Sequence, residues 1–294
     1  MQIAPRTLYE WKLRTRSLAM GERTLVMGIV NVTPDSFSDG GQFVSTDAAV
    51  EHALQLLQDG ADAIDVGGES TRPGAGAGTS EAISAEEEQS RVLPVIAALR
   101  TARPDAVISV DTYRAETARL AVDAGAEIVN DVSGMLWDRA MASTCADLRC
   151  GVVGMHTRGL PSEWYGQTQM SRGDLVTMVI RGLHDVALRL MLAGVNRSHV
   201  VLDPGFGFGK RGDENWTLLR VLSRLHELRF PLLAGLSRKG FLTNGEGRPE
   251  DRDEATAAAN SVAALTGVHM VRVHNVARTR AALAVADAVR YAEV

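Results

Sequence analysis

Residues 59–66 read DGADAIDV, and residues 123–131 read DAGAEIVND. In both stretches a glycine, Gly60 or Gly125, follows a helical pattern and precedes a short run rich in β-branched residues. Glycine is favoured just after the last turn of a helix, because it adopts the left-handed backbone conformation without a steric penalty. Each stretch therefore predicts a helix that turns back into a strand, which is the repeating junction of α/β folds.

The same alternation continues along the chain from residue 25. Strands are predicted at 25–30, 63–66, 107–110, 127–130, 152–155, 200–202, 232–235 and 270–273, and helices near 46–59, 85–102, 114–124, 138–147, 173–193, 213–228, 252–266 and 276–290. Ser84 and Glu87 form a predicted capping box, and Pro94 is expected to kink the helix that follows. Eight strand–helix units indicate a (β/α)8 TIM barrel, with a doubly wound open sheet as the alternative.

Residues 1–24 precede the first predicted barrel strand and form an N-terminal hairpin extension, which leaves residues 25–294 for the barrel domain. Residues 9–17, the turn at Met20 and Gly21, and the run that starts at Thr24 indicate the parts of this short β-hairpin. We expect the hairpin to lie across the bottom of the barrel and to cover its core.

The composition limits the class of protein. The 294 residues include 31 basic and 36 acidic side chains, for a net charge of −5, with 45% apolar and 23% charged residues. These fractions are typical of a folded globular protein and exclude a disordered one. The acidic balance argues against nucleic-acid or membrane partners, because those surfaces need a basic face. A small anionic ligand stays possible, since a few local cations can hold it.

Cysteine usage and the N-terminus indicate a cytoplasmic protein. Cys145 and Cys150 are too few for a disulfide framework or a four-ligand zinc site, so core packing is predicted for both. Lys12 and Arg14 precede an apolar stretch that Glu22 interrupts, which argues against a signal peptide. No apolar run reaches the length of about 18 residues that a transmembrane helix needs.

Polar side chains follow every predicted strand. The carboxyl ends of barrel strands form one rim, which carries the active site in TIM-barrel enzymes. These ends carry Asn31, Asp65, Asp111-Thr112, Asn130-Asp131, Met155-His156, Asp203, Ser237-Arg238-Lys239, and Arg272 with His274. A single Asp or Asn after a strand is more often a helix cap or turn residue. A full rim of them, with cations on four of the loops, is poorly explained by capping.

The residue types at this rim suit a flat heterocycle that carries a phosphate or diphosphate. Asp111, Asn130 and Asp203 offer acceptors for ring N–H groups, and Lys239 offers a donor. The guanidinium plane of Arg272 can stack on a ring face. Arg238, Arg272, His274 and Asn31 could gather the phosphate, Asn31 could share a magnesium ion with it, and Lys210 and Arg72 are expected on loops over the mouth.

Weaker patterns are discounted. Residues 205–210, GFGFGK, lack the spacings of a Walker loop and of a dinucleotide fingerprint, so we interpret their glycines as allowing close backbone approach beside the pocket. The histidines show no HExxH or paired metal spacing. Asp35 and Asp39 fit a turn role and a functional loop role equally well.

Six motifs together resemble the dihydropteroate synthases. They are NVTPDSFSDGG at 31–41, DVGGESTRPG at 65–74, SVDT at 109–112, VLDPGFGFGK at 201–210, SRK at 237–239 and RVH at 272–274. They follow one another as a (β/α)8 barrel unrolls, and the resemblance spans about residues 25–290. It implies a transferase of folate biosynthesis that condenses 4-aminobenzoate with (7,8-dihydropterin-6-yl)methyl diphosphate to give 7,8-dihydropteroate and pyrophosphate.

The resemblance also implies the site residues. The pterin would be held by Asp111, Asn130, Met155, Asp203, Gly235, Lys239 and Arg272. The diphosphate would be held by Asn31, Arg72, Arg272 and His274, with magnesium at Asn31. The 4-aminobenzoate would be held by Phe37, Thr71, Arg72, Pro73, Phe208 and Gly240. Asp111, Lys239, Arg272 and His274 would act in catalysis, and sulfonamides, which mimic 4-aminobenzoate, would inhibit.

The chain departs from the family pattern at three places. Gly240 stands where the family often has serine, and Asn275 where it often has aspartate. The stretch 73–84 is longer than usual and rich in glycine, which suggests a mobile lid.

Two alternative functions stay open, and so does the oligomeric state. A methyltetrahydrofolate-dependent methyltransferase should share the pterin-binding set but lack the 31–41 loop and the diphosphate group, whereas a catalytically silent pterin-binding paralogue could keep both. The family is commonly dimeric through its outer helices. The alanine-rich stretches 254–264 and 277–288 could form a homodimer interface or pack on the barrel's own core.

Overall fold

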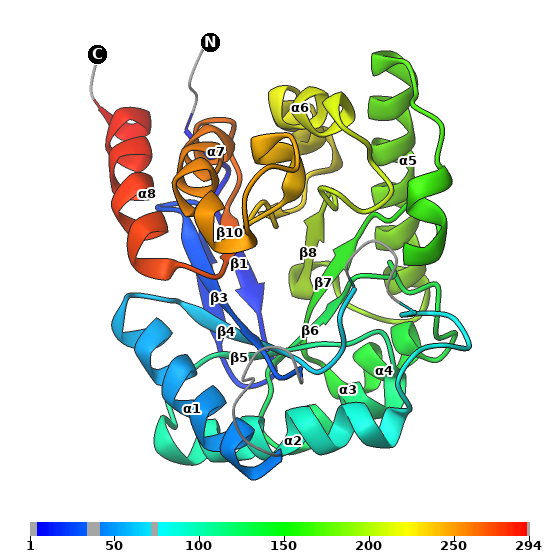
Figure 1. Ribbon diagram of the computed structural model, residues 1–294, viewed down its shortest axis with the longest axis vertical. Coiled ribbons are helices and arrows are strands. Elements are labelled where there is room, and N and C mark those ends of the chain that lie inside the picture. Colours follow the sequence, from blue (N-terminus) through cyan, green and yellow to red (C-terminus); the bar gives the residue numbers. More distant parts are fainter. Residues whose placement is uncertain (1–4, 34–41, 72–75, 293–294) are drawn as a thin grey trace.

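The computed structural model describes residues 5–33, 42–71 and 76–292 and contains a ring of eight parallel strands surrounded by helices (Figure 1). The strands are β3 (Leu25–Asn31), β4 (Ala63–Gly67), β5 (Ile108–Asp111), β6 (Ile128–Asp131), β7 (Gly151–Met155), β8 (Val200–Asp203), β9 (Leu233–Ala234) and β10 (Met270–Val273). Their alternation with helices confirms the predicted fold class.

The strand pairing closes the sheet into a barrel. Each strand from β3 to β7 pairs with the next one along the chain, and β10 lies between β9 and β3. A parallel bridge between Leu202 and Leu232 joins the two ends of the sheet, and the amide of Leu202 donates to the carbonyl of Pro231 at 3.0 Å. This closure excludes the doubly wound open sheet, because an open sheet leaves two unpaired edges.

The helices form the outer layer (Figure 1). They are α1 (Gln42–Gln58), α2 (Ala85–Ala102), α3 (Ala115–Asp123), α4 (Met141–Leu148), α5 (Arg172–Leu192), α6 (Asp213–Arg220), α7 (Asp253–Leu265) and α8 (Val276–Tyr291). Ser84 caps α2 by accepting the amide of Glu87 at 3.1 Å, and Pro94 does not end this helix.

The single helix predicted at 213–228 is wrong. The structure has α6 up to Arg220 and then a 3₁₀ segment, η4 (Leu222–Leu228). Leu222 and Leu225, three residues apart, are both fully buried. A spacing of three matches the three residues per turn of a 3₁₀ helix, so the tighter helix places both leucines in the core.

The two glycines that predict the helix-to-strand junctions have the expected conformation. Gly60 has φ +100° and Gly125 has φ +122°, each just beyond a helix end. A Cβ atom added at Gly125 would lie 2.9 Å from Cγ of Arg100, so this turn has no room for a side chain.

The N-terminal hairpin covers the bottom of the barrel, as predicted, but the predicted turn at Met20 and Gly21 is wrong, because the hairpin turns between Lys12 and Ser17. Strands β1 (Tyr9–Lys12) and β2 (Ser17–Met20) pair in antiparallel fashion. Trp11 is fully buried, and its indole N–H donates to the carbonyl of His199 at 2.8 Å. The hairpin residues Trp11, Leu13 and Met20 form one cluster with Leu25, Met27, Ala63, Val107, Ile128, Val153, Val201, Leu233 and Met270 from the barrel strands.

Strand alternation separates this apolar layer from the polar rim. Because side chains alternate between the two faces of a strand, every second residue points into the barrel. In β4, Ala63 belongs to the bottom cluster and Asp65 stands two residues further along; in β10, Met270 and Arg272 have the same relation. Strands β4, β5, β6, β8 and β10 thus each contribute an apolar residue to the bottom of the interior and a polar one above it, whereas Met155 and Gly235 take the upper position at β7 and after β9.

Two smaller expectations concern burial and membranes. Cys145 and Cys150 are both buried in the core, as predicted. In the part of the chain that the structure describes, no helix has the length and apolarity needed to span a membrane.

Candidate active site

The structure brings most of the predicted site residues to the carboxyl-terminal rim of the barrel. Asn31, Asp111, Asn130, Met155 and Asp203 lie at the ends of β3, β5, β6, β7 and β8; Gly235 and Lys239 follow β9; Arg272 lies in β10 and His274 just beyond it. Thr71 and Phe208 are half-buried and Gly240 is exposed. Phe37, Arg72, Pro73, Asp35 and Asp39 lie outside the described residues.

Arg272 is the centre of a buried cluster of charges. Its Nε donates to Oδ2 of Asp65 at 2.5 Å, and its terminal nitrogen donates to Oδ2 of Asp111 at 2.6 Å. The amide of Asn130 donates to the same oxygen of Asp65 at 2.9 Å. These hydrogen bonds therefore link the carboxyl-terminal ends of β4, β5 and β6 to β10 across the interior of the barrel.

Burial controls the ionisation of Asp111. Loss of solvent around the carboxyl raises its pKa to about 7; Arg272 opposes this rise, and Asp65, Glu88 and Asp131 add to it. A carboxyl group with such a raised pKa in a site of converging polar groups is typical of functional residues.

A second charged pair stands on the opposite side of the rim. Burial raises the pKa of Asp203 to about 6, while Lys239 and Lys210 oppose the rise. Burial likewise lowers the pKa of Lys239 to about 8, although Asp203 favours its charged form. The ammonium of Lys239 lies 4.1 Å from the ring centroid of Phe208, a cation–π contact. Gly207 allows this approach, because an added Cβ would lie 3.2 Å from Cδ of Lys239.

His274 is oriented by Ser237. The Ser237 hydroxyl oxygen accepts the backbone N–H of His274 at 3.1 Å and lies 2.9 Å from its ring Nδ1. A hydroxyl that accepts one N–H still has its own proton to donate to Nδ1. In that arrangement Nε2 carries the ring proton and is the donor of a neutral imidazole.

Two cations expected at the mouth are engaged elsewhere. Lys210 is buried, and its ammonium donates to the carbonyls of His156 at 2.9 Å and Gly205 at 2.7 Å. The prediction that Lys210 lies over the mouth is therefore wrong. Its side chain points inward and connects the loop after β8 to the loop after β7. Arg238 makes two contacts with the carboxylate of Asp253, at 2.8 and 3.1 Å, so its guanidinium is paired with α7.

Asn275 also contacts Asp253, the partner of Arg238. Its side-chain oxygen accepts the amide of Arg278 at 3.1 Å and so caps α8, while its nitrogen donates to Asp253 at 2.9 Å. An aspartate at this position could cap the helix but would face the carboxylate of Asp253 with a second negative charge. The asparagine thus joins the loops after β9 and β10 through Asp253.

The described part of the 73–84 stretch, residues 76–84, makes hydrogen bonds to the loops after β4 and β5, and the mobile lid expected there stays a prediction. The amide of Gly78 donates to the Tyr113 hydroxyl at 3.1 Å, and that hydroxyl donates to Glu69 at 2.9 Å. Ala77 is buried. A Cβ added at Gly78 would lie 2.9 Å from the Trp137 ring, which shows how closely this segment packs on the loop after β6.

Comparison with known proteins places this geometry in a family. Residues 27–274 match the pterin binding enzyme family. The chain is 41% identical over 284 residues to the dihydropteroate synthase of Synechocystis, covering 96% of this chain and 92% of that protein. The chain belongs to the pterin-binding enzymes.

Solved structures of pterin-binding enzymes agree with the barrel seen here. The dihydropteroate synthase of Xanthomonas albilineans with 4-aminobenzoic acid has a TM-score of 0.87 at 43% identity, covering 98% of this chain and 100% of that one. The Yersinia pestis enzyme in a sulfonamide drug complex has a TM-score of 0.86 at 39% identity, covering 96% and 100%. These relatives favour the synthase over the methyltransferase and the silent paralogue.

Gly240, the departure from the pterin-binding enzymes nearest the rim, leaves open space. A Cβ added there would have the Cα of Gly245 as its nearest neighbour, at 4.0 Å. The position could therefore take a serine without rearrangement of the described residues around it.

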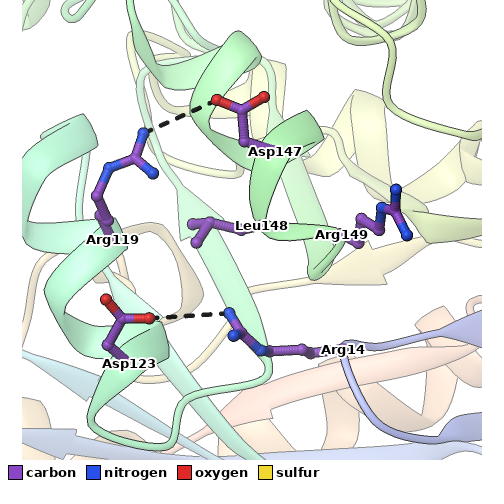
Figure 2. Close-up of a pocket in the computed structure, with 6 residues that line it drawn as sticks. All are labelled: Arg14, Arg119, Asp123, Asp147, Leu148 and Arg149. Atoms are coloured by element: carbon purple, nitrogen blue, oxygen red, sulfur yellow. Dashed lines mark ion pairs between the residues drawn. The ribbon is translucent and has the colours of Figure 1, made fainter.

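A surface pocket of about 450 Å³ lies away from the rim, on the outside of the barrel (Figure 2). It is lined by Arg14, Arg119, Asp123, Asp147, Leu148 and Arg149, near the hairpin and the ends of α3 and α4 (Figure 2). Its two ion pairs are long, at 4.0 and 3.9 Å, and their side chains are exposed. Long ion pairs between exposed side chains are ordinary surface contacts, so these residues need no ligand to explain them.

Two residues that hold the rim cluster together carry no predicted binding or catalytic role in the sequence. Asp65 pairs with Arg272 and Asn130, and Ser237 orients His274. The signal for Asp65 is a carboxylate at an inward position of an otherwise apolar strand, where a charge is costly unless it is paired. Ser237 gives no comparable signal, because serine is common in turns after strands.

Proposed function

We propose that this chain catalyses the dihydropteroate synthase reaction. The observation that carries the proposal is the set of acceptors Asp111, Asn130 and Asp203 inside one barrel mouth, with the cations Lys239 and Arg272 beside them. A pterin presents adjacent N–H groups and a ring carbonyl, which such a set can bind. The Xanthomonas albilineans enzyme has also been solved with 7,8-dihydropteroate, the product of this reaction.

The pterin ring is proposed to lie deep in the mouth. Asp111, Asn130 and Asp203 accept its N–H groups, and the ammonium of Lys239 donates to its carbonyl or ring nitrogen. Met155 and Gly235 line the slot, and Gly235 leaves space beside Asp203, since an added Cβ would lie 3.7 Å from Oδ2. The Arg272 guanidinium flanks the ring.

The diphosphate is proposed to lie above the ring, toward solvent. Arg272 and His274 donate to its oxygens, together with Asn31 and Arg72, and Nε2 of His274 is the donor if Ser237 holds the ring as described. The C–O bond to the diphosphate breaks, and its electron pair leaves with pyrophosphate. The pterinylmethyl cation that results is stabilised by the Asp111 carboxylate, more strongly in the transition state than in the ground state.

Magnesium fits this arrangement only with help from the substrate. Among the described residues, no group of three or more His, Cys, Asp and Glu side chains could hold a metal ion. Asn31 supplies an amide oxygen at the end of β3, and Mg²⁺ commonly combines one or two protein oxygens with substrate phosphates and waters. When bound, the ion would neutralise charge on the leaving pyrophosphate.

The 4-aminobenzoate is proposed to enter last. Its amine attacks the pterinylmethyl carbon, the C–N bond forms, and the amine loses a proton, so no side-chain nucleophile is required. Phe208 and the turn at Gly240 lie beside Lys239, and Thr71, with Phe37, Arg72 and Pro73, completes the proposed site. Sulfonamides, one of which is bound in the Yersinia pestis complex, are proposed to inhibit this chain at the same place.

The test is a coupled assay of pyrophosphate release with 4-aminobenzoate and the pterin diphosphate, with and without magnesium. Release that needs both substrates is expected, and Lys239→Ala and Arg272→Ala should weaken pterin diphosphate binding measured by calorimetry. Pyrophosphate release no faster than the background in either condition would reject the proposal and favour a silent paralogue.

A homodimer through the outer faces of α7 and α8 is also proposed. Val262 on α7 and Val285 and Val289 on α8 are apolar and between 42% and 65% exposed. Analytical ultracentrifugation should show a dimer, and Val285→Asp should convert it to a monomer.

A further inference from the structure

Asp65 is a buried carboxylate whose contacts are both to proposed substrate-binding residues. Its side chain has no exposed surface, and its Oδ2 accepts from Arg272 and Asn130. Its Oδ1 is buried without a hydrogen-bond partner among the described residues. A buried charge is destabilising unless it is paired. The position of Asp65 is therefore better explained by what it holds than by core stability.

We infer that Asp65 is a positioning residue for the pterin diphosphate. Arg272 keeps its Nε contact with Asp65 when substrate binds, while its contact with Asp111 is replaced by contacts to the substrate. This inference rests on the proposed function, because it takes the pterin diphosphate as the ligand of Arg272.

The exposure of the three side chains indicates which contact the substrate can reach. Asp65 is 0% exposed, Asp111 is 15% exposed and Arg272 is 20% exposed. The contact between Arg272 and Asp111 is thus the one open toward the mouth, and the contact with Asp65 is enclosed beneath it. An anion that arrives from the mouth competes with Asp111 for the terminal nitrogen and leaves Nε with Asp65.

Replacement of the contact between Arg272 and Asp111 makes both side chains available to the substrate, Arg272 to the diphosphate and Asp111 to the pterin ring. The contact with Arg272 occupies Oδ2 of Asp111, an acceptor that a ring N–H could otherwise approach. When Arg272 turns its terminal nitrogen to the diphosphate, Asp111 is released to the ring. Asp65 prevents the guanidinium from leaving its place during this exchange, and so keeps the cation beside the pterin.

Asn130 is positioned by the same carboxylate. Its side-chain nitrogen donates to Asp65, so its oxygen faces the other way and is available to accept a ring N–H. Without Asp65 the amide is free to flip and present a donor where the substrate also has a donor. One residue therefore sets the direction of two substrate contacts.

The test compares Asp65→Asn with a matched buried carboxylate. Asp65→Asn keeps the shape but removes the charge, and should raise the KM for the pterin diphosphate about tenfold or more, since hydrogen bonds to charged groups are strong. The KM for 4-aminobenzoate should change by less than about twofold, because these hydrogen bonds do not reach that substrate. Glu127→Gln is the control, since Glu127 is also buried and pairs with an arginine, Arg16, at 3.1 Å, but at the start of β6, at the bottom of the barrel. It should change neither KM.

A second measurement does not depend on the variant folding. In wild-type protein labelled with ¹⁵N, the Nε–H signal of Arg272, assigned with Arg272→Lys, should stay protected from solvent exchange before and after addition of the pterin diphosphate. Loss of that protection on binding would overturn the inference, as would an unchanged KM in folded Asp65→Asn. Wild-type protein that releases no pyrophosphate would instead overturn the proposed function.

Discussion

The two ends of the barrel are built from the same strands and have opposite chemistry. At the bottom, Trp11 of the hairpin packs on an apolar layer that includes Met27 and Met270. At the rim, β10 instead carries Arg272, which is paired with Asp65 and Asp111. Apolar burial favours folding directly, whereas buried charges must be offset by their partners. The comparison indicates that the apolar bottom stabilises the fold, whereas the buried charges of the rim lower its stability and serve function.

The largest expected effect is at the bottom. Trp11→Ala removes a fully buried indole and its hydrogen bond to His199, so it should lower the free energy of unfolding by about 3–5 kcal/mol. Urea denaturation measures this loss. In conditions where the variant is folded, the KM values for the pterin diphosphate and for 4-aminobenzoate should equal those of the wild type. A change in either would contradict the statement that the two ends of the barrel have separate roles.

At the rim, Asp111→Asn should change activity and leave stability unchanged, the opposite of Trp11→Ala. Loss of a charge placed to stabilise a developing cation should lower turnover by about a hundredfold or more. The unfolding free energy should not fall, because the carboxyl is desolvated at a cost, as its pKa of about 7 indicates. Pyrophosphate release and urea denaturation test the two statements, and near-normal turnover would remove Asp111 from its assigned role.

The pH dependence of kcat/KM should identify the rim carboxylate and ammonium. As pH falls through the Asp111 pKa of about 7, the carboxylate is protonated and kcat/KM should fall by about tenfold per unit. As pH rises through the Lys239 pKa of about 8, the ammonium is lost and kcat/KM should fall again. A profile flat from pH 5 to 9 would contradict both assignments, and Asp111→Asn should move the acidic limb from about 7 toward the Asp203 pKa of about 6.

The smallest effect is expected at Gly240. Gly240→Ser adds a hydroxyl in open space and should lower the KM for 4-aminobenzoate by less than about threefold, the range of one exposed hydrogen bond. Stability should stay the same. Gly125→Ser is the contrasting variant, because φ is +122° there and Arg100 fills the space, so it should be clearly destabilising.

Much of the fold was predictable because its signals are local. Short β-branched runs, helical spacing and the junction glycines at 60 and 125 depend on neighbours along the chain. The error at 213–228 has the same origin, since an apolar spacing of three fits the start of an α-helix as well as the 3₁₀ segment that packing selected.

The sequence by itself determined which residues reach the rim, because the end of each strand can be located from the chain alone. Only the tertiary structure decided how those residues pair. Asp65 and Arg272 are 207 positions apart, and they meet because the barrel closes β10 on β3 and aligns their inward faces. Lys210 turned inward to the carbonyl of His156 because β7 and β8 are neighbours in the barrel. Long-range contacts depend on the register of the strands and on the closure of the barrel, and neither can be predicted from the residues of one segment.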